Sequence, residues 1–444
     1  MTNSANHHAR VLQDKQYLWH PFTPQQRWIA GDPTVIVSGS GCYLIDDQGH
    51  KYLDAVSSLW TTVHGHNHPV LNAAIEQQLK HIAHSTMLGL THPTAIELAR
   101  RLVSLTPKPL ARVFYSDSGS TATEIAIKMA FQSQQHRGHL RRTKFATLVD
   151  AYHGDTLGAV SVGGIDLFHH TFKPLLFNSL ALPAPRSPGG EEERDCLTRA
   201  LEMLDAHAHE LAGFIFEPLV QGAAGMKMHS ASYINTLAEH ARSKGLLLIA
   251  DEVAVGFGRT GTLFACEKLS FSPDFLCLAK GITGGYLPLA ATLATEAVYE
   301  DFLGLPEEGK QFFHGHTYTG NPLACAVAIA SLDIFEQEQV LEHTAMLTET
   351  LGQGLAQLKT RPWVSEIRQH GVLVGIDLCH PDGGELHPST GHKVAMASRP
   401  LGAILRPLGN TLVLNPPLCM TRAETLQLLK ITDDACAEVF AGVP

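Results

Sequence analysis

The chain has 444 residues, of which 44% are hydrophobic and 17% are charged, and its formal net charge is −10. This composition is typical of a globular protein with two or three domains, and the acidic balance argues against a nucleic-acid partner. No apolar run reaches the roughly 18 residues needed to span a membrane, so no membrane partner is expected. The amino terminus lacks the apolar core of a secretory signal and the cysteines are scattered, so we expect a cytoplasmic protein with reduced thiols.

The first 70 residues are rich in proline and glycine and hold short apolar runs such as GCYLID at 41–46. We expect this N-terminal segment, residues 1–70, to pack on a smaller domain formed by the end of the chain. It contains the histidine cluster HGHNH at 64–68, which could suggest a metal site. The alternating spacing followed by Pro69 favours a turn instead, and we expect no metal ion.

Residues 71–340 alternate apolar runs with amphipathic stretches, a pattern that predicts one large domain of parallel strands joined by helices. The expected strands lie at 112–117, 145–150, 211–217, 246–251 and 275–280. The expected helices lie at 121–132 and 234–245, and a longer helical region lies at about 320–358. The segment at 182–195, rich in proline, glycine and glutamate, is expected to form a surface loop.

The end of the chain, residues 341–444, has a different pattern. VSEIRQHGVLVGIDL and GAILRPLGNTLVLNPPL are typical of antiparallel hairpins, with turns at Gly371 and at residues 408–410. These hairpins predict a smaller α+β domain, which the N-terminal segment completes. The expected fold class is therefore α/β, with a mostly parallel central sheet flanked by helices and this second, smaller domain.

The stretch GFGRTG at 256–261 has the glycine spacing of a dinucleotide-binding turn and closely follows an expected strand. However, Asp251 and Glu252 occupy the junction where such glycines belong, and TLFACE leaves room for only a short helix. Asp274 lies near the distance expected for a ribose-binding acid, so a nicotinamide-dependent oxidoreductase is the rival hypothesis. We interpret the glycines as a loop.

Each of the five expected strands ends in polar or ionisable residues, and ligands bind outside the carboxyl ends of parallel strands. Gly119 and Ser120 lie just before the helix expected at 121–132, where small residues and the helix dipole favour a phosphate, although a helix cap without a ligand is the better explanation of these residues taken alone. Tyr152 places a flat ring at the mouth of the same crevice, and Glu217 ends a third strand.

Lys280 leaves a buried strand and enters a glycine-rich loop. Because burial lowers the pKa of an amine, such a lysine is suited to nucleophilic attack on a carbonyl. Asp251 ends the neighbouring strand in the chain order, and a buried carboxylate can keep a pyridine nitrogen protonated. Together with the phosphate-binding turn and the tyrosine, these residues predict a site for pyridoxal 5′-phosphate (PLP).

The chain resembles the class III aminotransferases of PLP fold type I over nearly its whole length. The resemblance implies that Lys280 forms the Schiff base, that Asp251 contacts the pyridinium nitrogen, and that Tyr152 stacks on the cofactor near the substrate. It also implies that Gly119 and Ser120 bind the phosphate. The stretches that carry the resemblance are DSGSTATEIAIKMA, AYHGDT, FEPLVQGAAGM, ADEVAVGFGRTGTLFACE, CLAKGITGG and FHGHTYTGNPLACA.

In this family two subunits share each active site, so the resemblance implies a homodimer. His316 and Thr317 would complete the phosphate site of the other subunit, and Gly315 would lie near its substrate.

Within the family, LWHPFTP, SSLWTTVHGHNHPVLNAAI, THPTAIELARRLV and ILRPLGN resemble the members that act in biotin synthesis. That subgroup converts 8-amino-7-oxononanoate to 7,8-diaminononanoate, which implies that Trp60 lines the substrate channel and that Arg406 binds the substrate carboxylate. S-adenosylmethionine is the expected amino donor. Phe22 stands where the subgroup usually has tyrosine, and Leu59 stands where it has a second tryptophan, so lysine as donor remains open. A general ω-aminotransferase of the 4-aminobutyrate or ornithine type and a non-catalytic binding protein are the broader alternatives.

Overall fold

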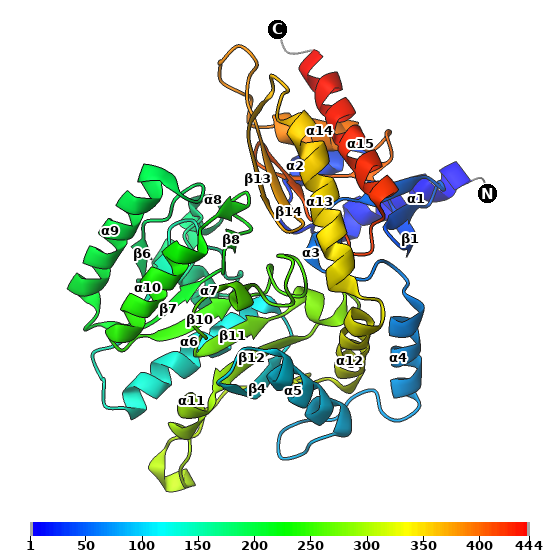
Figure 1. The fold of residues 1–444 in the computed structure, drawn as a ribbon. Coiled ribbons are helices and arrows are strands. Elements are labelled where there is room, and N and C mark those ends of the chain that lie inside the picture. The colour runs from blue at the N-terminus through cyan, green and yellow to red at the C-terminus, as the bar shows by residue number, and fades with distance from the viewer. Residues whose placement is uncertain (1–2, 442–444) are drawn as a thin grey trace.

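The structure is a computed structural model that describes residues 3–441. A seven-stranded sheet forms the centre of the molecule, and the segments from the two ends of the chain lie together beside it (Figure 1). The strands of the central sheet, in spatial order, are β4 (Leu110–Ser116), β12 (Ala290–Thr295), β11 (Phe275–Leu278), β10 (Leu247–Asp251), β7 (Leu211–Phe216), β5 (Lys144–Leu148) and β6 (Leu180–Leu182).

Six of these strands run in one direction. β10 pairs in parallel with β7 and β11, and β5 pairs in parallel with β7 and β6. β12 is antiparallel to both β11 and β4, so β4 again shares the direction of the others. The five expected strands are all present, whereas β12 and the short edge strand β6 were not expected from the sequence.

Alternate residues of the sheet face two separate layers of helices. Leu247 and Ile249 of β10 pack in the same core cluster as Ala122 and Ala126 of α6 (Gly119–His136). Leu248 packs on the other face with the apolar side of α10 (Ala231–Ser243). Because both faces are covered, all residues of β7, β10, β11 and β12 are buried, and the strands are continuous apolar runs.

The remaining elements of this part of the chain cover the sheet or connect its strands. The helices are α4 (Pro69–Leu79), α5 (Pro93–Leu105), α7 (Leu157–Ser161), α8 (Asp166–His169), α9 (Gly190–His207), α11 (Glu296–Glu300) and α12 (Pro322–Gln337). The shorter elements are the 3-10 helices η1 (His170–Leu175), η2 (Ala265–Lys268), η3 (Lys280–Thr283) and η4 (Pro306–Glu308) and the two-stranded sheet of β8 (Val220–Gln221) and β9 (Lys227–Met228).

The two ends of the chain are joined by a second sheet. Its order is β1-β2-β3-β15, in which Ala403 and Ile404 of β15 pair in parallel with Leu53 and Asp54 of β3. A third sheet, β13-β14-β17-β16, contains both hairpins expected from the sequence, with Gly371 and Gly409 in the left-handed region at φ 60°. The elements are α1 (Asn3–Tyr17), α2 (Gln25–Ala30), β1 (Ile36–Ser40), β2 (Tyr43–Asp46), β3 (Lys51–Asp54), α3 (Ser57–Trp60), α13 (Val340–Leu358), β13 (Val364–His370), β14 (Leu373–Leu378), α14 (Thr390–Ala397), β15 (Ala403–Ile404), β16 (Arg406–Leu408), β17 (Thr411–Leu414) and α15 (Arg422–Ala441). We retain residues 1–70, 71–340 and 341–444 as the proposed division of the chain.

The prediction of a loop at 182–195 is wrong for its second half, because α9 begins at Gly190. Three successive glutamates, residues 191–193, lie in the first turn of α9, where negative charge is favourable at the helix N-terminus.

The glycine stretch 256–261 is a loop, as expected, and no helix follows β10 before the four-residue η2. Asp274 accepts a hydrogen bond from the backbone N–H of Leu248 at 2.8 Å, so it is a structural residue of the sheet. Across residues 3–441, no helix has the length and apolar character needed to cross a membrane.

Candidate active site

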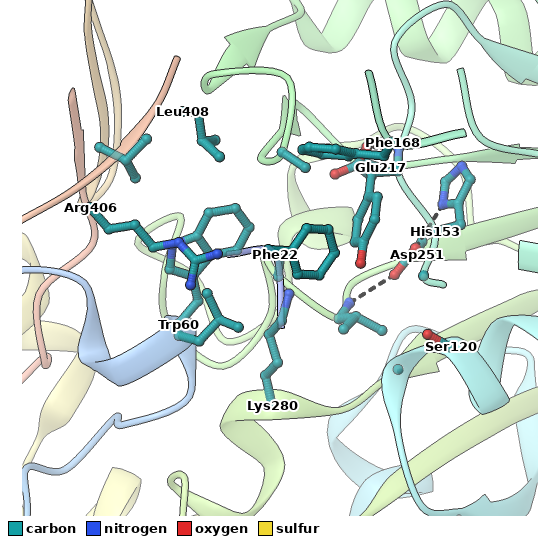
Figure 2. A pocket seen from close by; sticks show the side chains of 18 residues that line it. Phe22, Trp60, Ser120, His153, Phe168, Glu217, Asp251, Lys280, Arg406 and Leu408 are labelled. Atoms are coloured by element: carbon teal, nitrogen blue, oxygen red, sulfur yellow. Dashed lines mark hydrogen bonds and ion pairs between the residues drawn. The ribbon is translucent and has the colours of Figure 1, made fainter. Parts of the chain in front are cut away.

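A pocket lies at the carboxyl ends of the parallel strands, next to the segments from both ends of the chain (Figure 2). All of the predicted site residues line it except Gly315, His316 and Thr317. Those that line it are Phe22, Trp60, Gly119, Ser120, Tyr152, Asp251, Lys280 and Arg406. The direction of the strands brings these residues together from widely separated positions in the sequence.

Lys280 lies at the base of the pocket, two residues after the end of β11, and its amine points into the cavity. Its backbone is in the left-handed region at φ 44°, an unusual conformation for lysine that stores strain. Burial lowers the pKa of the Lys280 amine, and the carboxylates of Asp251 and Glu217 only partly oppose this. A lysine with a lowered pKa carries a larger neutral fraction, which is the nucleophilic form.

Asp251 is a buried carboxylate with a fixed orientation. Its Oδ2 accepts a hydrogen bond from Nδ1 of His153 at 2.7 Å, and its Oδ1 accepts one from the backbone N–H of Val253 at 3.0 Å. The side chain of His153 is fully buried, and its Nε2 has no hydrogen-bond partner within residues 3–441. His153 was not selected from the sequence, although the quoted motif AYHGDT contains it. The periodic pattern gave no reason to expect its contact with a strand end 98 residues away.

The N-terminus of α6 opens onto the same pocket. Ser118 caps this helix by accepting the N–H of Thr121 at 3.3 Å, so the simple capping role belongs to Ser118. Gly119 and Ser120 follow it and line the pocket. A Cβ at Gly119 would lie 2.5 Å from Cγ1 of Val253, so only glycine fits this close approach. The helix N-terminus and the absence of a side chain at Gly119 suit an anionic group.

Glu217 and Tyr152 form the adjoining wall. Glu217 accepts the N–H of Gly222 at 3.0 Å and that of Tyr152 at 3.3 Å. Burial raises the pKa of the Glu217 carboxyl to about 7. The Tyr152 ring lies nearly parallel to the ring of His169, with centroids 6.2 Å apart, and burial raises the pKa of the Tyr152 hydroxyl.

Trp60 lies next to Lys280, whose Nζ is 4.7 Å from the centroid of the Trp60 ring. The pocket has further apolar lining in Phe22 and Leu59 and in four residues that were not predicted, namely Phe168, Ala223, Leu408 and Val413. The Phe22 ring meets the Phe168 ring edge-on, with centroids 5.5 Å apart. These contacts join a loop near the N-terminus to α8, and no local sequence pattern indicates them.

Arg406, on β16, places a guanidinium beside this apolar wall (Figure 2). It forms no ion pair with any carboxylate in residues 3–441, and burial lowers the pKa of its guanidinium. A partly buried cation without a protein counter-ion is costly unless a ligand supplies the negative charge. The pocket therefore suits a molecule that has a carboxylate to pair with Arg406 and a reacting group near Lys280.

The backbone around Trp60 is strained. Ser57, Ser58 and Trp60 all have positive φ, between 50° and 64°, and each such residue costs about 1–3 kcal/mol. The Asp54 carboxylate holds this turn by accepting the N–H of Ser58 at 2.7 Å and that of Val56 at 3.2 Å. The position of Trp60 in the pocket wall is therefore imposed by its surroundings.

Gly315, His316 and Thr317 lie outside the pocket of their own chain. Thr317 is exposed, and Nδ1 of His316 lies 3.6 Å from Oδ2 of Asp117. Their contribution to the site of a second subunit remains a prediction.

The rings of the HGHNH cluster have three separate partners. His64 pairs with Ser331, His66 with Asp54 and His68 with Glu338, at Nε2–oxygen distances between 2.9 and 3.2 Å. In the part of the chain that the structure describes, no three histidine, cysteine or acidic side chains are grouped so that they could hold a metal ion.

Comparison with known proteins gives a consistent result. The model of the family "Aminotransferase class-III" matches residues 27–436. The adenosylmethionine-8-amino-7-oxononanoate aminotransferase of Nitratidesulfovibrio vulgaris is 49% identical, covering 95% of this chain and 80% of its own length. The crystal structure of the protein of that name from Methanocaldococcus jannaschii has a TM-score of 0.93 at 43% identity, covering 97% of this chain and 99% of the other. An ω-transaminase from Pseudomonas jessenii in complex with PMP has a TM-score of 0.93 at 29% identity, covering 97% of this chain and 98% of the other. These similarities confirm the predicted fold class.

The His153–Asp251 contact gives a first test. His153→Ala should lower the free energy of unfolding by about 2–4 kcal/mol, because a buried carboxylate loses its side-chain donor. His153→Asn, which retains an N–H donor, should lose less. The measurement is denaturant unfolding without added ligand, with His209→Ala at an exposed position as the matched control. A loss for His153→Ala no larger than for the control would show that the contact does not stabilise Asp251.

Proposed function

This chain belongs to the class III aminotransferase family, and we propose that it uses pyridoxal 5′-phosphate to convert 8-amino-7-oxononanoate to 7,8-diaminononanoate in biotin synthesis. The first-choice amino donor is S-adenosylmethionine. One observation carries the proposal: the buried Lys280 and the half-buried Arg406 line the same pocket. Arg406 has no acidic partner in residues 3–441. The names of the relatives support the same acceptor.

The residues of the pocket fit PLP. The place where only glycine fits at the start of α6 suits the phosphate, and the oriented Asp251 carboxylate suits a protonated ring nitrogen. Lys280 is the residue that would bind the cofactor covalently, and Tyr152 supplies an aromatic wall. When bound, PLP acts as an electron sink that stabilises the negative charge left when a proton leaves the amine-bearing carbon.

The chain's own residues would do the following work. Lys280, once the substrate amine has displaced it, is the nearest base and would take the proton from the amine-bearing carbon of the donor. Asp251 would keep the ring nitrogen protonated, and His153 would hold the Asp251 carboxylate in place for that task. The apolar walls would keep water from the reacting atoms.

The acceptor is matched to the two ends of the pocket. Arg406 would hold the carboxylate of the oxo acid, and the apolar residues Trp60, Phe168 and Leu408 would contact its aliphatic chain. The identity of the donor follows less directly from the resemblance, because this chain has Phe22 where the subgroup usually has tyrosine and Leu59 where it has tryptophan. Lysine with the same acceptor is therefore the second candidate, and a general ω-aminotransferase of the 4-aminobutyrate or ornithine type is the third.

We further propose that the enzyme is a homodimer with shared sites. His316 and Thr317 would contact the cofactor phosphate of the other subunit, and Gly315 would lie near its substrate. Gly315 and Thr317 are exposed, and all three residues lie outside the pocket of their own chain, which supports this assignment.

Single-turnover reaction with each candidate donor tests the function. The PLP-loaded enzyme is mixed with S-adenosylmethionine, lysine, 4-aminobutyrate or ornithine, and loss of the visible cofactor absorbance is followed. We expect conversion by S-adenosylmethionine, followed by formation of diaminononanoate when the oxo acid is added. Conversion by lysine alone would change the donor and leave the acceptor in place, whereas conversion by 4-aminobutyrate alone would contradict both.

The control for this assay is Lys280→Ala. It should abolish the visible absorbance of the bound cofactor and reduce turnover by several orders of magnitude, because both the covalent link and the base are lost. Wild-type protein that stays colourless with PLP would contradict the cofactor assignment itself.

Arg406→Ala should lower kcat/KM for the oxo acid roughly 10- to 150-fold, because the substrate carboxylate loses a charged partner. PLP affinity should be unchanged, and Arg406→Lys should give an intermediate loss because it keeps the charge without the bidentate geometry. Steady-state kinetics is the measurement, with the exposed Arg422→Ala as the control. Wild-type kinetics for Arg406→Ala would remove Arg406 from the substrate site.

Mixed dimers test the shared sites. Thr317→Ala should weaken PLP binding, and Lys280→Ala should be inactive. After subunit exchange at equal concentrations, activity at limiting PLP should exceed the sum of the parents, approaching about one quarter of wild type. Half of random dimers are mixed, and each mixed dimer has one intact site of two. Proven exchange without this gain would indicate sites built within one chain.

A further inference from the structure

Two cysteines far apart in the sequence lie in contact outside the pocket. Sγ of Cys42 and Sγ of Cys419 are 3.5 Å apart, although the residues are separated by 377 positions. Cys42 lies just before β2, and Cys419 follows β17 by a short loop. Both are free thiols in the structure.

Backbone hydrogen bonds fix both thiols in place. Gly41, next to Cys42, exchanges two backbone hydrogen bonds with His66, at 3.0 and 2.7 Å. The N–H of Leu418, next to Cys419, donates to Val63 O at 2.8 Å. A Cβ at Gly65 would lie only 2.9 Å from Sγ of Cys419, so the backbone is closely packed against this sulfur. The contact is therefore set by the packing of both segments and is not a chance approach of two mobile side chains.

The two thiols are chemically unequal. Cys42 is 3% exposed, whereas Cys419 is partly exposed. The hydrogen bond between the sulfurs lowers the pKa of Cys419 and raises that of Cys42. Because Cys419 is the more exposed of the two thiols, it is the first residue that an oxidant would reach, and Cys42 is its resolving partner.

We propose that Cys42 and Cys419 are a modification site at which a hydroperoxide produces a reversible internal disulfide. The Cys419 thiolate attacks one peroxide oxygen, which gives a sulfenic acid and releases water or an alcohol after protonation. The Cys42 sulfur then attacks the Cys419 sulfur and loses its proton, and a second water leaves. Two thiols lose two electrons and two protons, and the peroxide takes them up. The sulfur separation must shorten from 3.5 Å to about 2.05 Å.

The disulfide would join the two parts of the chain that build the substrate wall. Leu59 and Trp60 follow Cys42, and Arg406 and Val413 precede Cys419. The buried Arg259 already connects these segments, because it donates to Thr62 O and to Pro416 O. A covalent link beside it would restrain the unfolded chain through a very long loop and raise thermal stability.

The experiment treats the PLP-loaded, full-length wild-type enzyme with a small excess of hydrogen peroxide. Free thiols are then alkylated, and the protein is mapped by peptide mass spectrometry. We expect a peptide pair that links Cys42 to Cys419, a loss of about 2 Da from the intact chain, and full reversal by dithiothreitol. The oxidised enzyme should melt about 3–5 °C higher than the reduced enzyme.

The variants separate the roles. In Cys42→Ser the sulfenic acid on Cys419 should persist and be trapped by dimedone, and neither Cys42→Ser nor Cys419→Ser should show the rise in melting temperature. Cys379→Ser, at a partly exposed thiol that donates to Pro362 O, is the matched control and should still form the link. The wild-type map does not depend on the folding of any variant. Peroxide-treated enzyme in which Cys42 and Cys419 stay alkylatable, or in which Cys419 is overoxidised while Cys42 stays free, would overturn the proposal.

Discussion

Six of the seven central strands run in the same direction, and this constraint determines where the protein can carry out chemistry. Both faces of the sheet are covered by helices, so its interior is closed to ligands. Its carboxyl edge is the place where buried backbone gives way to polar side chains. Asp251, Glu217 and Lys280 all reach the pocket from this edge because their strands are parallel in the sheet or share one direction across it.

The charged residues of the pocket differ in how far the protein itself provides their partners, and this difference indicates where ligands would bind. Asp251 has its full set of protein donors in His153 and Val253, so its orientation does not depend on a ligand. Lys280 and Arg406 are different, because burial lowers the pKa of each and neither forms an ion pair within residues 3–441. A partly buried guanidinium without a counter-ion costs stability in the free protein, and the carboxylate of the proposed substrate would supply the compensation at Arg406. At Lys280 the carboxylates of Asp251 and Glu217 already offset part of the effect of burial.

The sequence predicted the parts of the molecule that rest on local pattern. Continuous apolar runs revealed five strands, and glycines at tight turns revealed both hairpins. It missed β12, whose alanine-rich run has little strand character of its own and is a strand because β4 and β11 bury it. The site divides in the same way. Asp251 ends β10 and Lys280 lies two residues after β11, so both could be predicted from the pattern of apolar runs. His153 and Phe168 matter only through contacts that folding creates. The proposed roles of His316 and Thr317 need a second chain, which no periodicity describes.

The two halves of the pocket also differ in how freely they can change. The cofactor half is built from residues held at strand ends and a helix start, and at Gly119 any side chain would collide with Val253. The proposed donor half includes Phe22 and Leu59, two residues that are 57% and 44% exposed and lie outside the central sheet. Substitutions there cost little packing energy, so the donor contacts can change while the fold and the PLP chemistry stay the same. Similarity across the whole chain therefore supports the reaction type and the acceptor more strongly than the donor, and this is why the choice between S-adenosylmethionine and lysine rests on the single-turnover measurement.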